Sequence, residues 1–173
     1  MYQKLLVGTD GSENSERALK KAKEISNIWN GKMIVFHSTT HKMPEPIIPM
    51  STPYPSIMDH ATGLEFIQET QTNTINYQIP KEDYENIKSA HENQGIKIID
   101  RAKQVLKFEE ENIEYRLITE KPSDYILERI DEEGVDLVVL GCKGQHSKLK
   151  QVFVGTVATK VLNNASCDVL IVR

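Results

Sequence analysis

The sequence predicts an α/β fold in which a parallel sheet is covered by helices on both faces. Short apolar runs typical of buried strands alternate along the chain with segments of helical periodicity. The first strand, helix and strand form a βαβ unit, whose strands should be parallel and joined by a right-handed crossover. A length of 173 residues is typical of one domain, and we expect a single domain over residues 1–173.

The first βαβ unit has clear boundaries. Lys4 to Thr9 is an apolar strand, and Lys32 to His37 is a second one. Between them, Ser12 is expected to cap a helix of about 17 residues, and Asn30, which tolerates positive φ, is expected to end it. The inward face of this helix is predicted to contain Ala18, Leu19, Ala22, Ile25, Ser26 and Trp29.

Residues 39–80 form an insert of different character. Five of the seven prolines lie between Pro44 and Pro55, and the rest is rich in Thr, Asn and Gln. Proline excludes central strand and helix interior there. The insert is predicted to be a long loop or flap, with a short helix near Leu64 to Gln71. Such loops are functional or disordered, and the sequence leaves both readings open.

The alternation of helices and strands resumes after the insert. The predicted elements are a helix from Asp83 to about Glu111, a strand at 113–118, a helix at 124–133 begun by Pro122-Ser123, a strand at 136–140, a helix from Gly155 or Thr156, and a strand at 168–172. The residues expected to face inward from the first and last of these helices are Ile87, Ala90, Gln94, Ile98, Ala102, Val105 and Leu106, and then Val157, Ala158, Val161 and Leu162.

Composition narrows the function classes. The formal net charge of −4 argues against general binding to nucleic acid or to an anionic membrane. No apolar run approaches the roughly 20 residues of a membrane span. Cys142 and Cys167 have no metal-ligand spacing and are too few for a disulfide framework. The chain begins without a signal-peptide pattern, so the cytoplasm is the expected location.

A glycine-containing stretch after the 136–140 strand carries the strongest functional signal. Gly141 and Gly144 follow the strand at once, and Gly155-Thr156 opens the next helix. Glycine lets a backbone approach a ligand closely because it has no Cβ. A helix N-terminus presents unpaired N–H groups and a partial positive charge. This stretch is therefore predicted to hold the phosphates of a nucleotide, although a plain strand-to-helix turn would also explain the glycines.

The charges of the same loop agree with an anionic ligand. Lys143, Lys148 and Lys150 lie between Gly141 and Gly155 with no acid among them, and His146 is close by. A small positive patch on an acidic protein suits a small anion better than a nucleic acid, which needs a larger basic face. The alternative is a solvated lysine face.

Polar residues also follow the first two strands. Asp10 follows the first and His37-Ser38 the second, so one crevice should receive residues from three strand ends. The Asp10 carboxylate could accept a hydrogen bond from a ribose hydroxyl or help to position a phosphate-bound metal. The simpler readings are a turn and cap at Gly11-Ser12, a structural histidine at His37, and an apolar filler rather than a redox-sensitive thiol at Cys142.

Taken together, these segments resemble the universal stress protein family, everywhere outside the insert. The segments that carry the resemblance are Val7–Ser12, Ile34–His37, Gly134–Gly141, Gly144, Gly155–Val157 and Asp168–Val172. The resemblance implies a three-layer sandwich with a five-stranded parallel sheet of order 3-2-1-4-5, similar to adenine nucleotide alpha hydrolases and Rossmann-like folds. It also implies a homodimer through the C-terminal strand, 168–173. An exposed apolar edge strand would independently favour such pairing.

The resemblance further implies an ATP site with Mg²⁺ or Mn²⁺. ATP-binding members carry Gly-x-x-Gly, nine residues, then Gly and Ser or Thr. This chain departs from them with ten residues between Gly144 and Gly155. The extra residue either bulges out or displaces the N–H groups that face phosphate. Four parts of the ligand have implied contacts. Thr9 and Asp10 would lie near ribose and phosphate, Ser38 near adenine through its backbone, and Leu140 and Gly141 under the nucleoside. The phosphates would be surrounded by Gly144, Gly155, Thr156 and Val157, with Lys143 of the basic loop also in the binding set and Asp10 as the possible metal ligand.

Three functions are compatible with these residues. The first is an adenine-nucleotide-binding sensor or switch in the stress response, which acts on an unknown protein partner. The second is slow ATP hydrolysis or nucleotidyl transfer, for which no base other than Asp10 is apparent. The third is a family member that has lost nucleotide binding and acts through protein–protein contacts of its insert.

Overall fold

The computed structural model describes residues 1–39, 81–107, 111–143 and 154–173, and for residues 81–84 it describes the backbone alone. Three predictions fall outside the described residues: the loop or flap, the short helix near Leu64 to Gln71, and the phosphate contact of Gly144.

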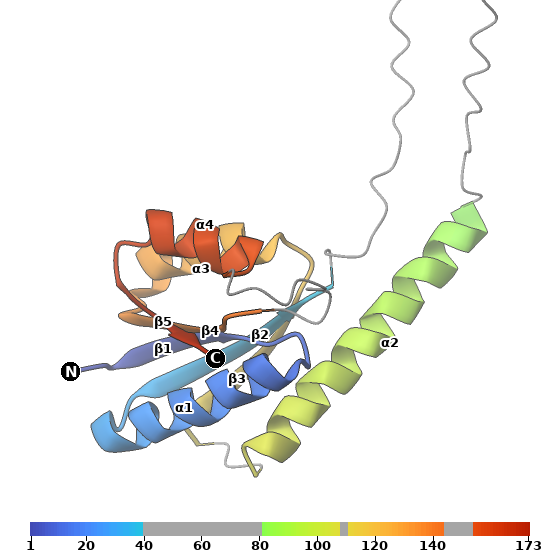
Figure 1. The fold of residues 1–173 in the computed structure, drawn as a ribbon. Helices are drawn as coiled ribbons and strands as arrows, with labels where there is room; N and C mark the ends of the chain where they lie inside the picture. Colours follow the sequence, from blue (N-terminus) through green and yellow to red (C-terminus); the bar gives the residue numbers. More distant parts are fainter. Residues whose placement is uncertain (40–80, 108–110, 144–153) are drawn as a thin grey trace, which may run out of the picture.

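Five parallel strands form one sheet in the order β3-β2-β1-β4-β5, which confirms the predicted topology (Figure 1). The strands are β1 (Lys4–Gly8), β2 (Lys32–Ser38), β3 (Ile113–Ile118), β4 (Leu137–Gly141) and β5 (Asp168–Val172). The helices that accompany them are α1 (Glu13–Trp29), α2 (Lys81–Val105), α3 (Pro122–Glu133) and α4 (Thr156–Asn164).

The helices cover both faces of the sheet. Figure 1 shows α1 and α2 on one side, and α3 and α4 on the other. Successive side chains of a strand point to opposite faces, so each central strand contributes to two cores. In β1, Leu5 and Val7 pack toward α1 and α2, whereas Leu6 packs toward α3 and α4. All three are fully buried, which explains the unbroken apolar runs of the strands.

Turn chemistry fixes the helix ends much as predicted. Ser12 caps α1, and its hydroxyl oxygen accepts a hydrogen bond from the N–H of Ser15. Asn30 ends α1 in the left-handed conformation, with φ of 51°. Gly134 does the same for α3, with φ of 65°. These positions therefore hold residue types that tolerate left-handed backbone.

One predicted core residue of α1 and one of α4 are instead exposed. Trp29 is 42% exposed and Leu162 is 45% exposed. Trp29 is the last residue of α1, and Leu162 lies in the last turn of α4, beside the inward-facing Val161. Periodicity places a residue on a helix face, but that face must also lie over the sheet for the residue to be buried.

Helix α2 differs from the prediction in its end and in its buried face. It ends at Val105 rather than near Glu111, and Lys107 then takes a left-handed φ of 60°. Ala90 and Gln94, expected to face inward, are both exposed. The N-terminal half of α2 projects beyond the sheet (Figure 1). The buried positions on this helix are Gly95, Ile99 and Ala102.

Gly95 sits where α2 crosses the end of the sheet. A Cβ at this position would lie 2.6 Å from Cδ1 of Leu117 and 3.0 Å from Cγ2 of Thr39. Glycine weakens a helix interior by roughly 1 kcal/mol relative to alanine. Here it permits a close approach of helix to sheet that no larger residue would allow without a shift of its neighbours.

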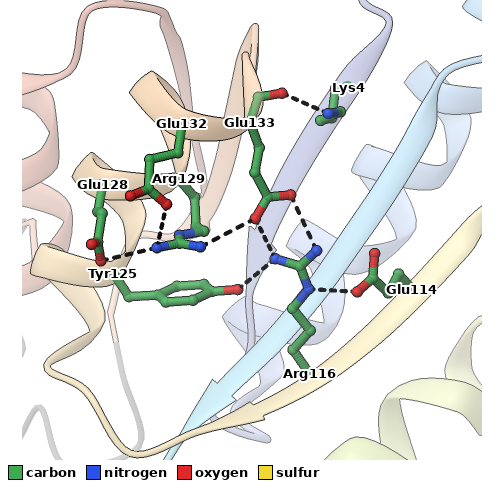
Figure 2. A network of polar contacts seen from close by, with 8 residues as sticks. All are labelled: Lys4, Glu114, Arg116, Tyr125, Glu128, Arg129, Glu132 and Glu133. Carbon is green, nitrogen blue, oxygen red and sulfur yellow. Dashed lines mark hydrogen bonds and ion pairs between the residues drawn. The ribbon is translucent and has the colours of Figure 1, made fainter.

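A polar network connects α3 to the edge strand β3 (Figure 2). Arg116 of β3 donates to both carboxylate oxygens of Glu133, at 2.6 and 3.1 Å, and to the Tyr125 hydroxyl at 3.0 Å. Its Nε also donates to Glu114. Lys4 of β1 donates to the backbone carbonyl of Glu133. The network therefore ties the C-terminal end of α3 to the sheet where the apolar core stops.

Candidate functional site

The carboxyl ends of β1, β2 and β4 lie side by side. Val7 pairs in register with Val35 of β2 and with Val139 of β4. The sheet order reverses between β1 and β4, and such a switch point is where open parallel sheets bind ligands. The residues that follow these strands, including Asp10 and Cys142, are thus brought to one edge as predicted.

Local hydrogen bonds fix the loop that carries Asp10. Its carboxylate oxygen Oδ1 accepts from the N–H of Ser12 at 3.0 Å. Gly11 has φ of 76°, which glycine adopts without strain. Thr9 is buried beneath the loop, and its hydroxyl lies 3.3 Å from that of Ser15. The Thr9 side chain thus supports the loop from below.

His37 ties the ends of β1 and β2 together. Its Nδ1 lies 2.7 Å from the carbonyl oxygen of Thr9, and the N–H of Thr9 donates to the carbonyl oxygen of Phe36 at 2.9 Å. This contact favours the structural reading of His37. The neighbouring Ser38 is buried and donates its hydroxyl proton to the carbonyl of Glu120 at 2.6 Å, so its side chain braces the turn before α3.

Two backbone hydrogen bonds close the base of the glycine-containing loop. The N–H of Cys142 donates to the carbonyl of Val172 in β5 at 2.7 Å, and the carbonyl of Cys142 accepts from the N–H of Gly155 at 2.8 Å. Residues 142 and 155, which flank the longer loop, are therefore held together. Cys142 is buried, as expected of an apolar filler.

Helix α4 begins at this point, and its N-terminus has no side-chain cap within the described ranges. Its N-cap residue is Gly155, which makes no side-chain capping bond. Helix geometry gives the N–H groups of Thr156, Val157 and Ala158 no intrahelical carbonyl. The first intrahelical bond is donated by Thr159 to Gly155 at 2.9 Å. An anion placed here would meet oriented N–H donors and the positive end of the helix dipole.

The described glycines of this stretch serve different purposes. A Cβ on Gly141 would lie 2.9 Å from backbone atoms of Asn14 and Ser15, so packing against α1 requires a glycine there. A Cβ on Gly155 would meet only the carbonyl oxygen of Cys142, at 3.6 Å, among the described residues. The φ of Gly155 is −62°, which any residue adopts. Neither packing nor backbone conformation in the described structure explains Gly155.

Leu140 forms the apolar floor at the end of β4. It is 6% exposed, and its Cδ2 would lie 2.9 Å from a Cβ added at Gly8. Val157 also packs its side chain against this core. Of the predicted site, the structure brings together at one edge Thr9, Asp10, Ser38, Leu140, Gly141, Lys143, Gly155, Thr156 and Val157.

Sequence reasoning missed one contact at the site. The side chain of Asn14 in α1 donates to the carbonyl of Lys143 at 3.3 Å. In the sequence, Asn14 is only a polar residue in the first turn of a helix. Its partner lies 129 residues away, and no local pattern marks such a contact.

Asp10 is chemically suited to a metal held on phosphates. Mg²⁺ is usually bound by one or two carboxylates together with substrate phosphates and water. Within the described ranges, no group of three or more His, Cys, Asp or Glu side chains could hold a metal ion by itself. A Mg²⁺ ion at this edge would thus take Asp10 as its protein ligand and supply positive charge to the phosphates.

The fold and site define an α/β protein with a polar, glycine-lined edge at the switch point of its sheet. The chain matches the sequence model of the universal stress protein family over residues 1–173, and it belongs to that family. Universal stress protein YxiE of Bacillus subtilis is 28% identical over 175 residues, with all of both chains covered.

Solved structures agree on the fold. Universal stress protein UspA of Lactobacillus plantarum superposes with a TM-score of 0.68 at 19% identity, over 99% of this chain and 98% of that one. A universal stress protein solved in complex with cAMP has a TM-score of 0.52 at 26% identity, over 99% of this chain and 97% of that one. In the part of this chain that the structure describes, no helix is both long and apolar enough to cross a membrane.

Proposed function

We propose that this protein binds an adenine nucleotide, with ATP as the leading candidate, at the edge formed by β1, β2, β4 and α4. Binding makes it a sensor or switch in the cytoplasmic stress response. The observation that carries the proposal is Gly155, which opens α4 without a left-handed φ and, among the described residues, without a steric reason to lack a side chain. A residue required to be small by a bound phosphate has this signature.

The donors around Gly155 suit phosphate. The N–H of Gly155 itself is used by Cys142, so the phosphate donors are the N–H groups of Thr156 and Val157 and the Thr156 hydroxyl. Thr156 is exposed, and its backbone lies at the positive end of α4. Lys143 on the facing loop adds positive charge to the same edge.

The nucleoside half is assigned to the strand ends. Asp10 receives the ribose hydroxyls or the phosphate-bound Mg²⁺ or Mn²⁺, Leu140 and Gly141 form the floor, and the Ser38 backbone contacts adenine. The related structure solved with cAMP supports an adenine ligand for this chain. It does not distinguish ATP from AMP or cAMP, so the number of phosphates remains to be measured.

Strand β5 supports a homodimer. It lies at the edge of the sheet, and Val169 and Ile171 are half-buried apolar residues there. An unpaired apolar edge favours pairing with a second chain. The partner would be a second copy of the protein, joined through residues 168–173.

Thermal unfolding with and without nucleotide tests the ligand assignment. ATP at 100 times its dissociation constant would stabilise the folded state by about 2.7 kcal/mol. For a chain of this length, the melting temperature would rise by about 5–10 °C. The panel comprises ATP, AMP, cAMP, adenosine and GTP, each with and without Mg²⁺. A rise with adenine compounds alone supports the proposal.

An absence of stabilisation by every nucleotide would overturn the proposal. If no nucleotide changes the melting temperature at millimolar concentration, the ten-residue loop has disabled the site and the proposal is wrong. Protein–protein contact would then be the function to test.

Sedimentation velocity with a charged substitution in β5, Val169→Lys, tests the dimer independently of nucleotide, because a charge on the edge opposes strand pairing.

A further inference from the structure

The start of α1 is joined to the loop after β4 through one carbonyl group. The oxygen of Lys143 accepts from the side-chain amide of Asn14 at 3.3 Å, and the Ser12 hydroxyl lies 3.5 Å from the same oxygen. Ser12 is the N-cap of α1 and Asn14 lies in its first turn, so both donors follow Asp10 closely in the chain. The two loops of the proposed nucleotide site therefore meet here, although they are far apart in sequence.

This junction depends on a close approach of backbone to backbone. Gly141 lies so near the first turn of α1 that a Cβ would be 2.9 Å from backbone atoms of Asn14 and Ser15. The missing side chain lets the end of β4 reach α1. The short amide of Asn14 then spans the remaining gap to Lys143.

The consequence for an anion follows from peptide geometry. The carbonyl of Cys142 is held by Gly155, and the carbonyl of Lys143 is held by Asn14. In a trans peptide the N–H points away from the carbonyl of the same unit. Holding the Cys142 carbonyl therefore fixes the direction of the Lys143 N–H, and holding the Lys143 carbonyl keeps a partially negative oxygen away from a phosphate.

We propose that Asn14 is a positioning residue for phosphate binding: its amide holds the Lys143 carbonyl, so that this peptide cannot turn its oxygen toward the phosphates. Asn14 acts through the loop and does not contact the ligand. The inference rests on the proposed nucleotide function and deepens it. It predicts that Asn14 affects the binding of phosphates and leaves the binding of the nucleoside unchanged.

Isothermal titration with ATP·Mg²⁺ and with adenosine tests this separation. Loss of one hydrogen bond corresponds to roughly five- to tenfold in a dissociation constant. Asn14→Ala should weaken ATP by about that factor and leave adenosine unchanged. Alanine is a better helix former than asparagine, which offsets part of the lost hydrogen bond, so the variant should still fold. Asn14→Asp, which keeps the shape but cannot donate, should lose at least as much ATP affinity.

Asn27→Ala provides a matched control. Asn27 is an exposed asparagine near the other end of the same helix, and its loss should change neither ligand's affinity. Equal weakening of ATP and adenosine by Asn14→Ala would show a general structural role and overturn the inference. Wild-type ATP affinity in Asn14→Ala or Asn14→Asp would overturn it as well. If the wild-type protein itself binds neither ligand, the proposed function fails, and this inference with it.

Discussion

The guanidinium group of Arg116 donates two parallel hydrogen bonds, of 2.6 and 3.1 Å, to the carboxylate of Glu133 (Figure 2). The two side chains are 25% and 22% exposed, so water screens the pair only partly. Bidentate geometry makes such a pair stronger than an ordinary surface contact. Arg116 also holds Glu114 and the Tyr125 hydroxyl, and it is therefore the centre of the network that fastens α3 to β3.

Replacing Arg116 should destabilise the fold. Arg116→Met keeps much of the apolar stem but removes the hydrogen bonds to Glu114 and Glu133 and leaves Glu133 only the longer contact with Arg129, at 3.5 Å. We expect a loss of about 1–3 kcal/mol in the free energy of unfolding. Urea denaturation measures it. The matched control is Arg17→Met, since Arg17 pairs with Glu13 on the solvent face of α1 with both side chains more than half exposed. That pair should contribute less than about 0.5 kcal/mol, and equal losses would refute the special role of Arg116.

The same pair predicts an acid-sensitive contribution to stability. Hydrogen bonds from Arg116 lower the pKa of Glu133 below its ordinary value of 4.5. A carboxylate with a lowered folded-state pKa stabilises the protein fully above the unfolded value, and the contribution is lost as the pH falls through the folded value. Urea midpoints of the wild type and Glu133→Gln should therefore differ most above about pH 5 and converge below pH 4.5. A difference that is constant with pH would contradict the assignment.

A serine at position 155 should separate helix stability from ligand binding. Gly155→Ser supplies a good N-cap, so the ligand-free melting temperature should stay the same or rise slightly. The new hydroxymethyl group would fill the space assigned to phosphate and compete for the N–H groups of α4. We expect ATP binding to weaken by about tenfold or more, as for the loss of charge-assisted hydrogen bonds. Unchanged ATP affinity, measured by titration calorimetry, would remove Gly155 from the phosphate site.

Gly141→Ala should lower the stability of the ligand-free protein, unlike Gly155→Ser. The added Cβ would lie 2.9 Å from the backbone of Asn14 and Ser15. Removing this clash would require the first turn of α1 to shift away from β4. We expect Gly141→Ala to cost about 1–3 kcal/mol, as for other overpacked sites. The comparison variant is Gly155→Ala, whose Cβ clashes with none of the described residues and whose expected loss is a weaker N-cap, about 0.5–1 kcal/mol. A smaller loss at 141 than at 155 would contradict the packing role of Gly141.

Most of the fold could be predicted because it depends on local signals. The buried strands are unbroken apolar runs, and the ends of α1 and α3 carry residues suited to their backbone, Asn30 and Gly134. The order of the strands came from the resemblance to a known family, since spacing alone does not fix it. The exposure of Trp29 could not be predicted, because it depends on where the end of α1 lies relative to the sheet.

The site was predictable in outline but not in detail. Asp10 and Gly155 could be placed at the same edge of the sheet because one follows a strand and the other opens a helix. Sequence could not separate Gly141, whose role is packing, from Gly155, which packing leaves unexplained. The contact of Asn14 with Lys143 and the pairing of Arg116 with Glu133 join residues from different elements, and such contacts exist only once the chain is folded.

The bond from the Cys142 amide to Val172 connects the candidate site to one edge of the sheet. An edge strand has a neighbour on one side only, so β5 is expected to open locally at a lower free energy than the central strands. Each opening would release the backbone of Cys142 and with it the anchor of Gly155. Fluctuations of this edge strand would thus limit how long the candidate site keeps its shape, and any molecule that pairs with β5 would prolong that time.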